Sequence, residues 1–164
     1  MENIGSSAAV DVEVYAKELR RLDSDGQWTR VETFPPMNLI WADVGGLHVS
    51  SMAPQTGRHC DIGHIMDPAE RQQWTVSKEI NPSLRLTASQ TSFTFALAVQ
   101  PNHKGDIVPS GIYQLHIVVA ARNARTLEAV LGLMVDGRWF NTEAQMLADG
   151  IHVDVIQQSV WGAS

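Results

Sequence analysis

Residues 111–135 read GIYQLHIVVAARNARTLEAVLGLMV, and apolar residues recur at every second position of this stretch, except around Asn123 and Arg125. A period of two is typical of a strand with one buried face, because successive side chains point to opposite sides of a sheet. The alternation runs through two segments, whose apolar faces are Tyr113, Leu115, Ile117, Val119, Ala121 and Leu127, Ala129, Leu131, Leu133, Val135. We therefore expect two long amphipathic strands, the second ended by the turn Asp136-Gly137.

The same period recurs along much of the chain. Residues 10–16, VDVEVYA, alternate apolar with mostly charged side chains, and the turn signal Asp25-Gly26 predicts that residues 14–22 and 28–34 form an antiparallel pair. Residues 44–57 are rich in turn formers and are expected to form a long loop. Further strands are expected at residues 37–43, 58–65, 74–80, 83–89, 92–99 and 151–156.

Helical signals are few. Pro68 suits the first position of a single helical turn. Residues 141–149, NTEAQMLAD, predict one short helix near the C-terminus, with Asn141 as its N-cap and Gly150 as the residue that ends it. About eight to ten short strands and one short helix predict an all-β antiparallel sandwich. We place a single domain at residues 1–156 and a C-terminal tail at 157–164.

Composition and charge narrow the range of partners and compartments. The 164 residues carry 18 acidic and 12 basic side chains, a net charge of −6, which argues against nucleic acid as a partner. No stretch approaches the roughly 20 apolar residues of a membrane helix, although a longer parent protein can carry an anchor elsewhere. Cys60 is the single cysteine and no signal peptide is visible, so a cytoplasmic location is favoured.

Two stretches resemble an immunoglobulin-like β-sandwich family of the CARDB type, found in uncharacterised prokaryotic proteins. The N-terminal stretch ENIGSSAAVDVEV is similar to the Asn-x-Gly signature near the start of such domains, with matching residues Asn3, Gly5, Ala9, Val12 and Val14. The stretch PSGIYQLHIVVAARNA resembles their penultimate strand, and the tail GRWFNTEAQMLADGIHVDVI is similar to the end of related proteins. The resemblance implies an immunoglobulin-like sandwich with no catalytic residues.

One part of that pattern is missing. The strand that should precede Asn3 is reduced to Met1 and Glu2. An unpaired edge is therefore expected beside residues 10–14, and such an edge is a template for a strand from another chain or another copy.

The segment RHCDIGH carries His59, Cys60, Asp61 and His64, which suggest a metal site or a nucleophilic pair. Strand geometry places His59 and Asp61 on one face and the other two on the opposite face, so no three of them converge. A metal site that uses two of these ligands and is completed by His48 or His116 is kept as an alternative. In a regular strand Cys60 and His64 lie roughly 13 Å apart, beyond hydrogen-bond reach. A purely structural role is therefore the favoured interpretation.

The aromatic residues include five tryptophans and two tyrosines. Trp28 and Trp74 stand at expected strand starts and are the best candidates for an exposed ligand-binding surface. Trp41 is expected in the core and Trp139 at one end of the sandwich. Tyr113 matches a tyrosine corner, in which the ring packs inside and the hydroxyl bonds to upstream backbone.

Three functions compete on these grounds. The favoured hypothesis is a non-catalytic interaction or adaptor module without a cofactor, which binds a protein partner or itself through an open sheet edge. The alternative is a sandwich that binds carbohydrate or another small ligand through exposed tryptophans. The third is a hydrolase built on His59, Cys60, Asp61 and His64.

Overall fold

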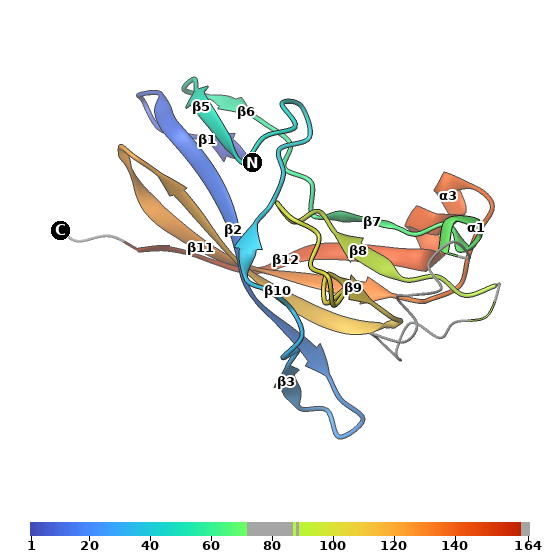
Figure 1. The fold of residues 1–164 in the computed structure, drawn as a ribbon. Coiled ribbons are helices and arrows are strands. Elements are labelled where there is room, and N and C mark those ends of the chain that lie inside the picture. Colours follow the sequence, from blue (N-terminus) through green and yellow to red (C-terminus); the bar gives the residue numbers. More distant parts are fainter. Residues whose placement is uncertain (72–86, 88, 162–164) are drawn as a thin grey trace.

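The computed structural model describes residues 1–71, 87 and 89–161, and its strands form an all-β, sandwich-like fold (Figure 1). The expected strands at 74–80 and 83–89 lie outside the described residues, apart from Thr87 and Ser89. The strands are β1 Glu2–Asn3, β2 Ala9–Leu22, β3 Trp28–Arg30, β4 Met37–Asn38, β5 His48–Met52, β6 Thr56–Gly57, β7 Gly63–Ile65, β8 Phe93–Phe95, β9 Ile107–Val108, β10 Gly111–Ala121, β11 Ala124–Val135 and β12 Ile151–Trp161. The helical segments are α1 Pro68–Arg71, α3 Glu143–Gln145 and the π-helical turn η2 Met146–Gly150.

The larger sheet is antiparallel, with the order β12-β11-β10-β2-β3, and β4 and β5 also pair with β2. Its inner face is the alternating apolar set expected from the sequence. Leu115 lies opposite Leu131 on one side and Leu19 on the other, so a single apolar row crosses three strands. The two long strands predicted within 111–135 are therefore confirmed as the centre of the fold.

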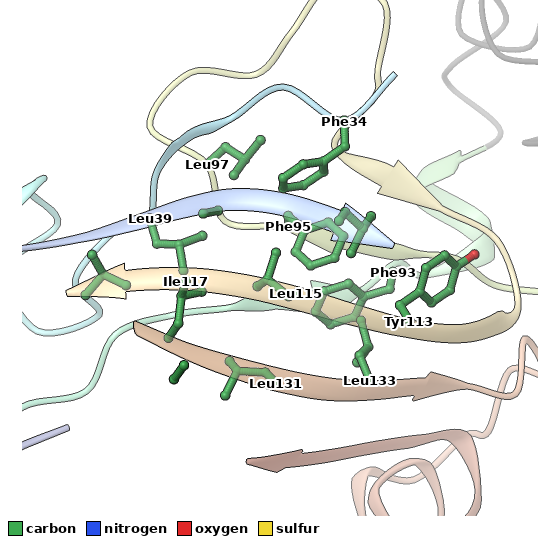
Figure 2. Packing of buried hydrophobic residues seen from close by; sticks show 14 of the residues in the cluster. Phe34, Leu39, Phe93, Phe95, Leu97, Tyr113, Leu115, Ile117, Leu131 and Leu133 are labelled. Atoms are coloured by element: carbon green, nitrogen blue, oxygen red, sulfur yellow. The ribbon is translucent and has the colours of Figure 1, made fainter. Parts of the chain in front are cut away.

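A second layer covers part of this inner face. It contains the antiparallel sheet β7-β8-β9 and, nearer the N-terminus, the short pair β1–β6. The core lies between the layers, where Phe95 makes edge-to-face contacts with Phe34 and Phe93 at centroid distances of 5.1 and 5.0 Å (Figure 2). Trp41 is fully buried, as expected. β8 is buried on both faces, since Thr94 between the phenylalanines is also inaccessible to solvent.

Two local predictions are confirmed by hydrogen bonds. The turn after β2 is closed by Asp23, whose Oδ1 accepts from the N–H groups of Asp25 and Gln27, and Gly26 has φ of 76°. The tyrosine corner is present: Tyr113 donates its hydroxyl to the Pro109 carbonyl at 2.9 Å. The hairpin partner of β2 is β3, which ends at Arg30 and is therefore shorter than the strand expected at residues 28–34.

The prediction of a long loop at residues 44–57 is wrong in part. It contains β5, which pairs with the first half of β2, and β6, which pairs with β1. The expected open edge beside residues 10–14 is therefore also wrong: Val12 lies opposite Val49 of β5, and Val14 lies opposite Val119 of β10.

The Asn-x-Gly turn at the N-terminus is held by side-chain bonds. Asn3 Oδ1 accepts from the N–H of Gly5 at 3.0 Å, and Asn3 Nδ2 donates to the carbonyls of Ser7 and Met52. A side-chain oxygen that bonds the backbone two residues on forms an Asx turn. Asn3 thus joins the start of the chain to the end of β5.

The C-terminal part differs from expectation in two details. The helix begins after Thr142 rather than Asn141, because the Thr142 hydroxyl accepts from the N–H of Gln145. Gly150 belongs to η2, and Ile151 follows as its C-cap. β12 continues to Trp161, which pairs with Thr126. Most of the expected tail at 157–164 is therefore part of the sheet.

Candidate interaction surface

The four candidate residues of the segment 58–64 do not converge. Cys60 is half-buried opposite Trp41, and its Sγ lies 3.6 Å from the Ile40 carbonyl, whereas His59 and Asp61 are exposed. Burial, followed by the nearby Asp61 charge, raises the pKa of the Cys60 thiol to about 11. At neutral pH the sulfur is therefore protonated, which makes it a poor nucleophile.

The two histidines that could have completed a metal site lie on other elements. His48 is on β5, and His116 is on β10 opposite Glu18. Among residues 1–71, 87 and 89–161, no three histidine, cysteine or acidic side chains are placed to hold a metal ion.

His64, on β7, lines a hollow of about 510 Å³ beside α3, together with Trp139 and Glu143. Trp139 therefore stands at one end of the sandwich, as expected. The hollow combines aromatic, acidic and imidazole side chains that are distant in sequence, which is why sequence reasoning did not bring them together.

Trp28 is partly exposed, with 38% of its surface accessible, and Trp74 lies outside the described residues. Trp28 lines a shallow hollow of about 200 Å³ on the outer face of the large sheet, together with Ile112 and Met134. His152 and Asp154, also in its lining, contact each other at 2.7 Å. The structure thus places an aromatic ring and a polar pair in one hollow.

The longest unpaired edge among the described strands belongs to β12. β12 is 11 residues long and pairs along one side with β11, whereas no other described strand pairs with its second side. The other outer strands of this sheet, β3, β4 and β5, have five residues or fewer.

The side chains of this edge are unusually apolar for an exposed strand. Val153, Val155 and Ile156 are 40%, 64% and 55% exposed. The strand contains neither lysine nor proline, two residues that commonly protect edges. Its protective features are Asp154 and an irregularity at Ile156, where the pairing with β11 shifts register.

On the inner face, the sheet and the N-terminal part of the second layer enclose an apolar cavity of about 440 Å³. Its floor is built from β10, β11 and β12, where Ile117 lies opposite Ala129, and Leu131 lies opposite Val155. Its other wall includes Ile4, Cys60 and Ile62. The second layer is therefore too narrow to cover the sheet as far as β12.

Comparisons with protein-family models, curated proteins and solved structures found no match for this chain. In the part of the chain that the structure describes, no helix is both long and apolar enough to cross a membrane.

Proposed function

We propose that this chain is a non-catalytic interaction module that binds another polypeptide strand along the free edge of β12. The observation that carries the proposal is an 11-residue strand with one unpaired side and exposed valine side chains. Unpaired backbone N–H and C=O groups on such an edge accept an added strand, and alternate side chains decide which strand fits.

A second copy of β12 can pair with this edge, and its side chains then match those of the first copy on both faces of the sheet. In an antiparallel arrangement centred on Val153, Ile151 lies opposite Val155 of the second copy, which continues the apolar inner row. On the outer face, His152 then lies opposite Asp154 of the second copy. Apolar cross-strand pairs and pairs of opposite charge both stabilise antiparallel sheets. We therefore propose self-association as the first interaction of this edge.

The non-catalytic part of the proposal is supported by the protonated Cys60 thiol and by the separation of His59, Asp61 and His64 from any third ligand within the described residues. The resemblance to CARDB-type sandwiches supports the same role, because those domains carry no catalytic residues. The Asx turn at Asn3 lies within the N-terminal stretch on which this resemblance is based.

Sedimentation velocity over a range of protein concentrations tests the proposal. We expect the wild-type protein to pass from monomer to dimer as its concentration rises. Val153→Lys places two like charges opposite each other at the centre of the pair and should leave the protein monomeric. Val99→Lys makes the same substitution at an exposed valine that lies after β8 and outside the large sheet. It is the matched control and should dimerise like the wild type.

The proposal is overturned if the wild type stays monomeric up to its highest soluble concentration, or if both lysine variants dimerise as well as the wild type. Hydrogen exchange locates the contact: the β12 amides should become protected as the dimer forms. Protection confined to other strands would contradict the edge.

A second candidate function is carbohydrate binding on the outer face, which the hollow with Trp28, His152 and Asp154 favours. Sugar rings stack on exposed aromatic side chains, and polar pairs bond to their hydroxyls. Titration of tryptophan fluorescence with a glycan panel tests this function. A saturable change that disappears in Trp28→Ala supports it, and a flat response across the panel excludes it for the glycans tested.

A further inference from the structure

The exposed pair His152 and Asp154 on β12 lies at the place where two copies of the chain would meet. We propose that a zinc ion binds there between two copies, with the imidazole of His152 and the carboxylate of Asp154 from each copy as its four ligands. This inference rests on the proposed pairing of β12 with a second copy, and it names the ion that strengthens that pairing.

Within one copy the two ligand atoms already lie together. His152 Nε2 and Asp154 Oδ2 are 2.7 Å apart, and their side chains are 63% and 68% accessible to solvent. The residues are two positions apart in a strand, so both side chains stand on the same, outer face of the sheet. The hollow that they line contains no lysine or arginine, and their neighbours on β11, Met134 and Gly132, carry no charge. An ion can therefore reach both atoms from solvent.

One copy alone supplies too few ligands. Structural zinc sites bind the ion through four protein ligands in a tetrahedral arrangement. Within the described residues no three histidine, cysteine or acidic side chains are placed to hold a metal ion, and the pair on β12 provides two. A site with four ligands therefore needs the same pair from a second copy.

The boundaries of the regular part of β12 favour one register for this second copy. The turn η2 ends at Gly150, and the pairing of β12 with β11 shifts register at Ile156. The regular stretch between these two points is residues 151–155, and its middle residue is Val153. Two identical antiparallel segments that use the whole stretch are centred on Val153, so each His152 lies opposite Asp154 of the second copy.

This register brings the four side chains to one point on the outer face. Directly opposite residues in an antiparallel pair have Cβ atoms roughly 5 Å apart, and residues two apart along a strand are separated by roughly 7 Å. Zinc bond lengths of about 2.0–2.2 Å place neighbouring tetrahedral ligand atoms roughly 3.3 Å from each other. The contact of 2.7 Å between His152 Nε2 and Asp154 Oδ2 has to open by only about 0.6 Å to reach this spacing.

The ligand set and the charge of the chain favour zinc. Zinc binds imidazole nitrogen and carboxylate oxygen, whereas Mg²⁺ and Ca²⁺ prefer oxygen ligands. Two carboxylates also balance the charge of one divalent ion. Each copy carries a net charge of −6, so two copies repel each other, and a cation held between them offsets part of this repulsion.

Sedimentation velocity of the wild-type protein in EDTA, in ZnCl₂ and in MgCl₂ tests the site, at about pH 7.5 so that the ligands can lose their protons. We expect zinc to lower the dissociation constant of the dimer at least about tenfold relative to EDTA, a usual size for such coupling. Magnesium should leave the constant unchanged. Titration calorimetry should give one zinc ion for every two chains.

One variant and a matched control assign the ligands. His152→Gln removes one ligand from each copy at an exposed position, so the fold should be kept. It should still dimerise in EDTA through the backbone edge and Val153, but its dimer should no longer respond to zinc. His59→Gln is the control, because His59 and Asp61 have the same spacing and are also exposed but lie outside β12. It should respond to zinc like the wild type.

The outcomes separate this inference from the proposed function. If the wild type dimerises in EDTA and zinc leaves its dissociation constant unchanged, the metal site is refuted and the proposed function stands. Binding of one zinc ion per chain would also refute the site, as would a zinc response that His59→Gln abolishes and His152→Gln keeps. A chain that stays monomeric in both EDTA and zinc would refute the proposed self-association together with the metal site.

Discussion

The hydroxyl of Tyr113 offers the sharpest test of the fold. Tyr113→Phe keeps the buried ring and removes one hydrogen bond, the one donated to the Pro109 carbonyl at 2.9 Å. The ring leaves no cavity, and Pro109 is only half-buried, so water can partly replace the lost donor. We expect the free energy of unfolding to fall by about 1 kcal/mol, the usual net value of one such bond. For a domain of this size, that corresponds to a fall in Tm of roughly 2–4 °C.

Urea unfolding of the wild type and two variants measures this difference. The chain has one other tyrosine, Tyr15, which is partly exposed on β2, so Tyr15→Phe is the matched control. Its effect should stay within about 0.5 kcal/mol, as for most surface substitutions. Equal stability of Tyr113→Phe and wild type would refute the tyrosine corner. A loss above about 3 kcal/mol would show that the ring had moved, and would also contradict the reasoning.

Alkaline titration gives an independent check on the same residue. Burial raises the pKa of Tyr113 from 10.0 to about 12. Between these values the unfolded chain loses the proton that the folded chain still holds, so stability falls as pH rises from about 10 to about 12. The absorbance of tyrosinate should show a step near pH 12 that Tyr113→Phe lacks. If the variant retains the step, the assignment of that pKa is wrong.

Three further predictions concern buried or bridging side chains. Burial raises the pKa of Asp106, whose Oδ1 has no hydrogen-bond partner among the described residues. The folded state therefore holds its proton to higher pH than the unfolded state, and stability falls as pH rises through the folded pKa. Asp106→Asn should flatten this slope and raise the free energy of unfolding at pH 7 by about 1 kcal/mol; an unchanged slope in urea titrations at several pH values would contradict it. The amide of Asn123 accepts from the Val10 N–H and donates to the Ala8 carbonyl, both at 2.8 Å. Asn123→Ala should lower the free energy of unfolding by roughly 1–2 kcal/mol in the same assay, and an effect no larger than that of Asn102→Ala, in an exposed loop, would count against the bridge. Alkylation of Cys60 should accelerate about tenfold per pH unit between pH 8 and pH 10, because only the thiolate reacts; a plateau by pH 9 would be inconsistent with a thiol pKa near 11.

The strands that the sequence predicted well are those in which local pattern and tertiary role agree. β2, β10 and β11 alternate because one face of each packs on the core, and the turn at Asp23–Gln27 carries its own hydrogen-bond acceptor. The tyrosine corner was predictable for the same reason, since Tyr113 and its acceptor Pro109 are four residues apart.

The parts that were missed depend on partners distant in the chain. β5 lies among turn formers such as Gly45 and Gly46, and pairing with β2 makes it a strand. The free edge was expected at residues 10–14 because the sequence does not show that His48–Met52 fills that position. The sequence also did not predict the free edge at β12, because an alternating pattern identifies a strand but not its place in a sheet.

The bridge from Asn123 to Ala8 and Val10 has a consequence for the order of events during synthesis. β2 emerges early, yet its neighbour β10 and this clamp are encoded about a hundred residues later. At typical translation rates that interval lasts on the order of 5–20 s. During this interval one edge of the 14-residue strand β2 lacks its native neighbour. Long-range strand pairing of this kind is slow even in the complete chain. Newly made chains are therefore most prone to aggregate until residue 121, the last residue of β10, has been synthesised. A molecular chaperone that binds extended apolar segments should raise the yield of soluble protein most if it acts during this interval.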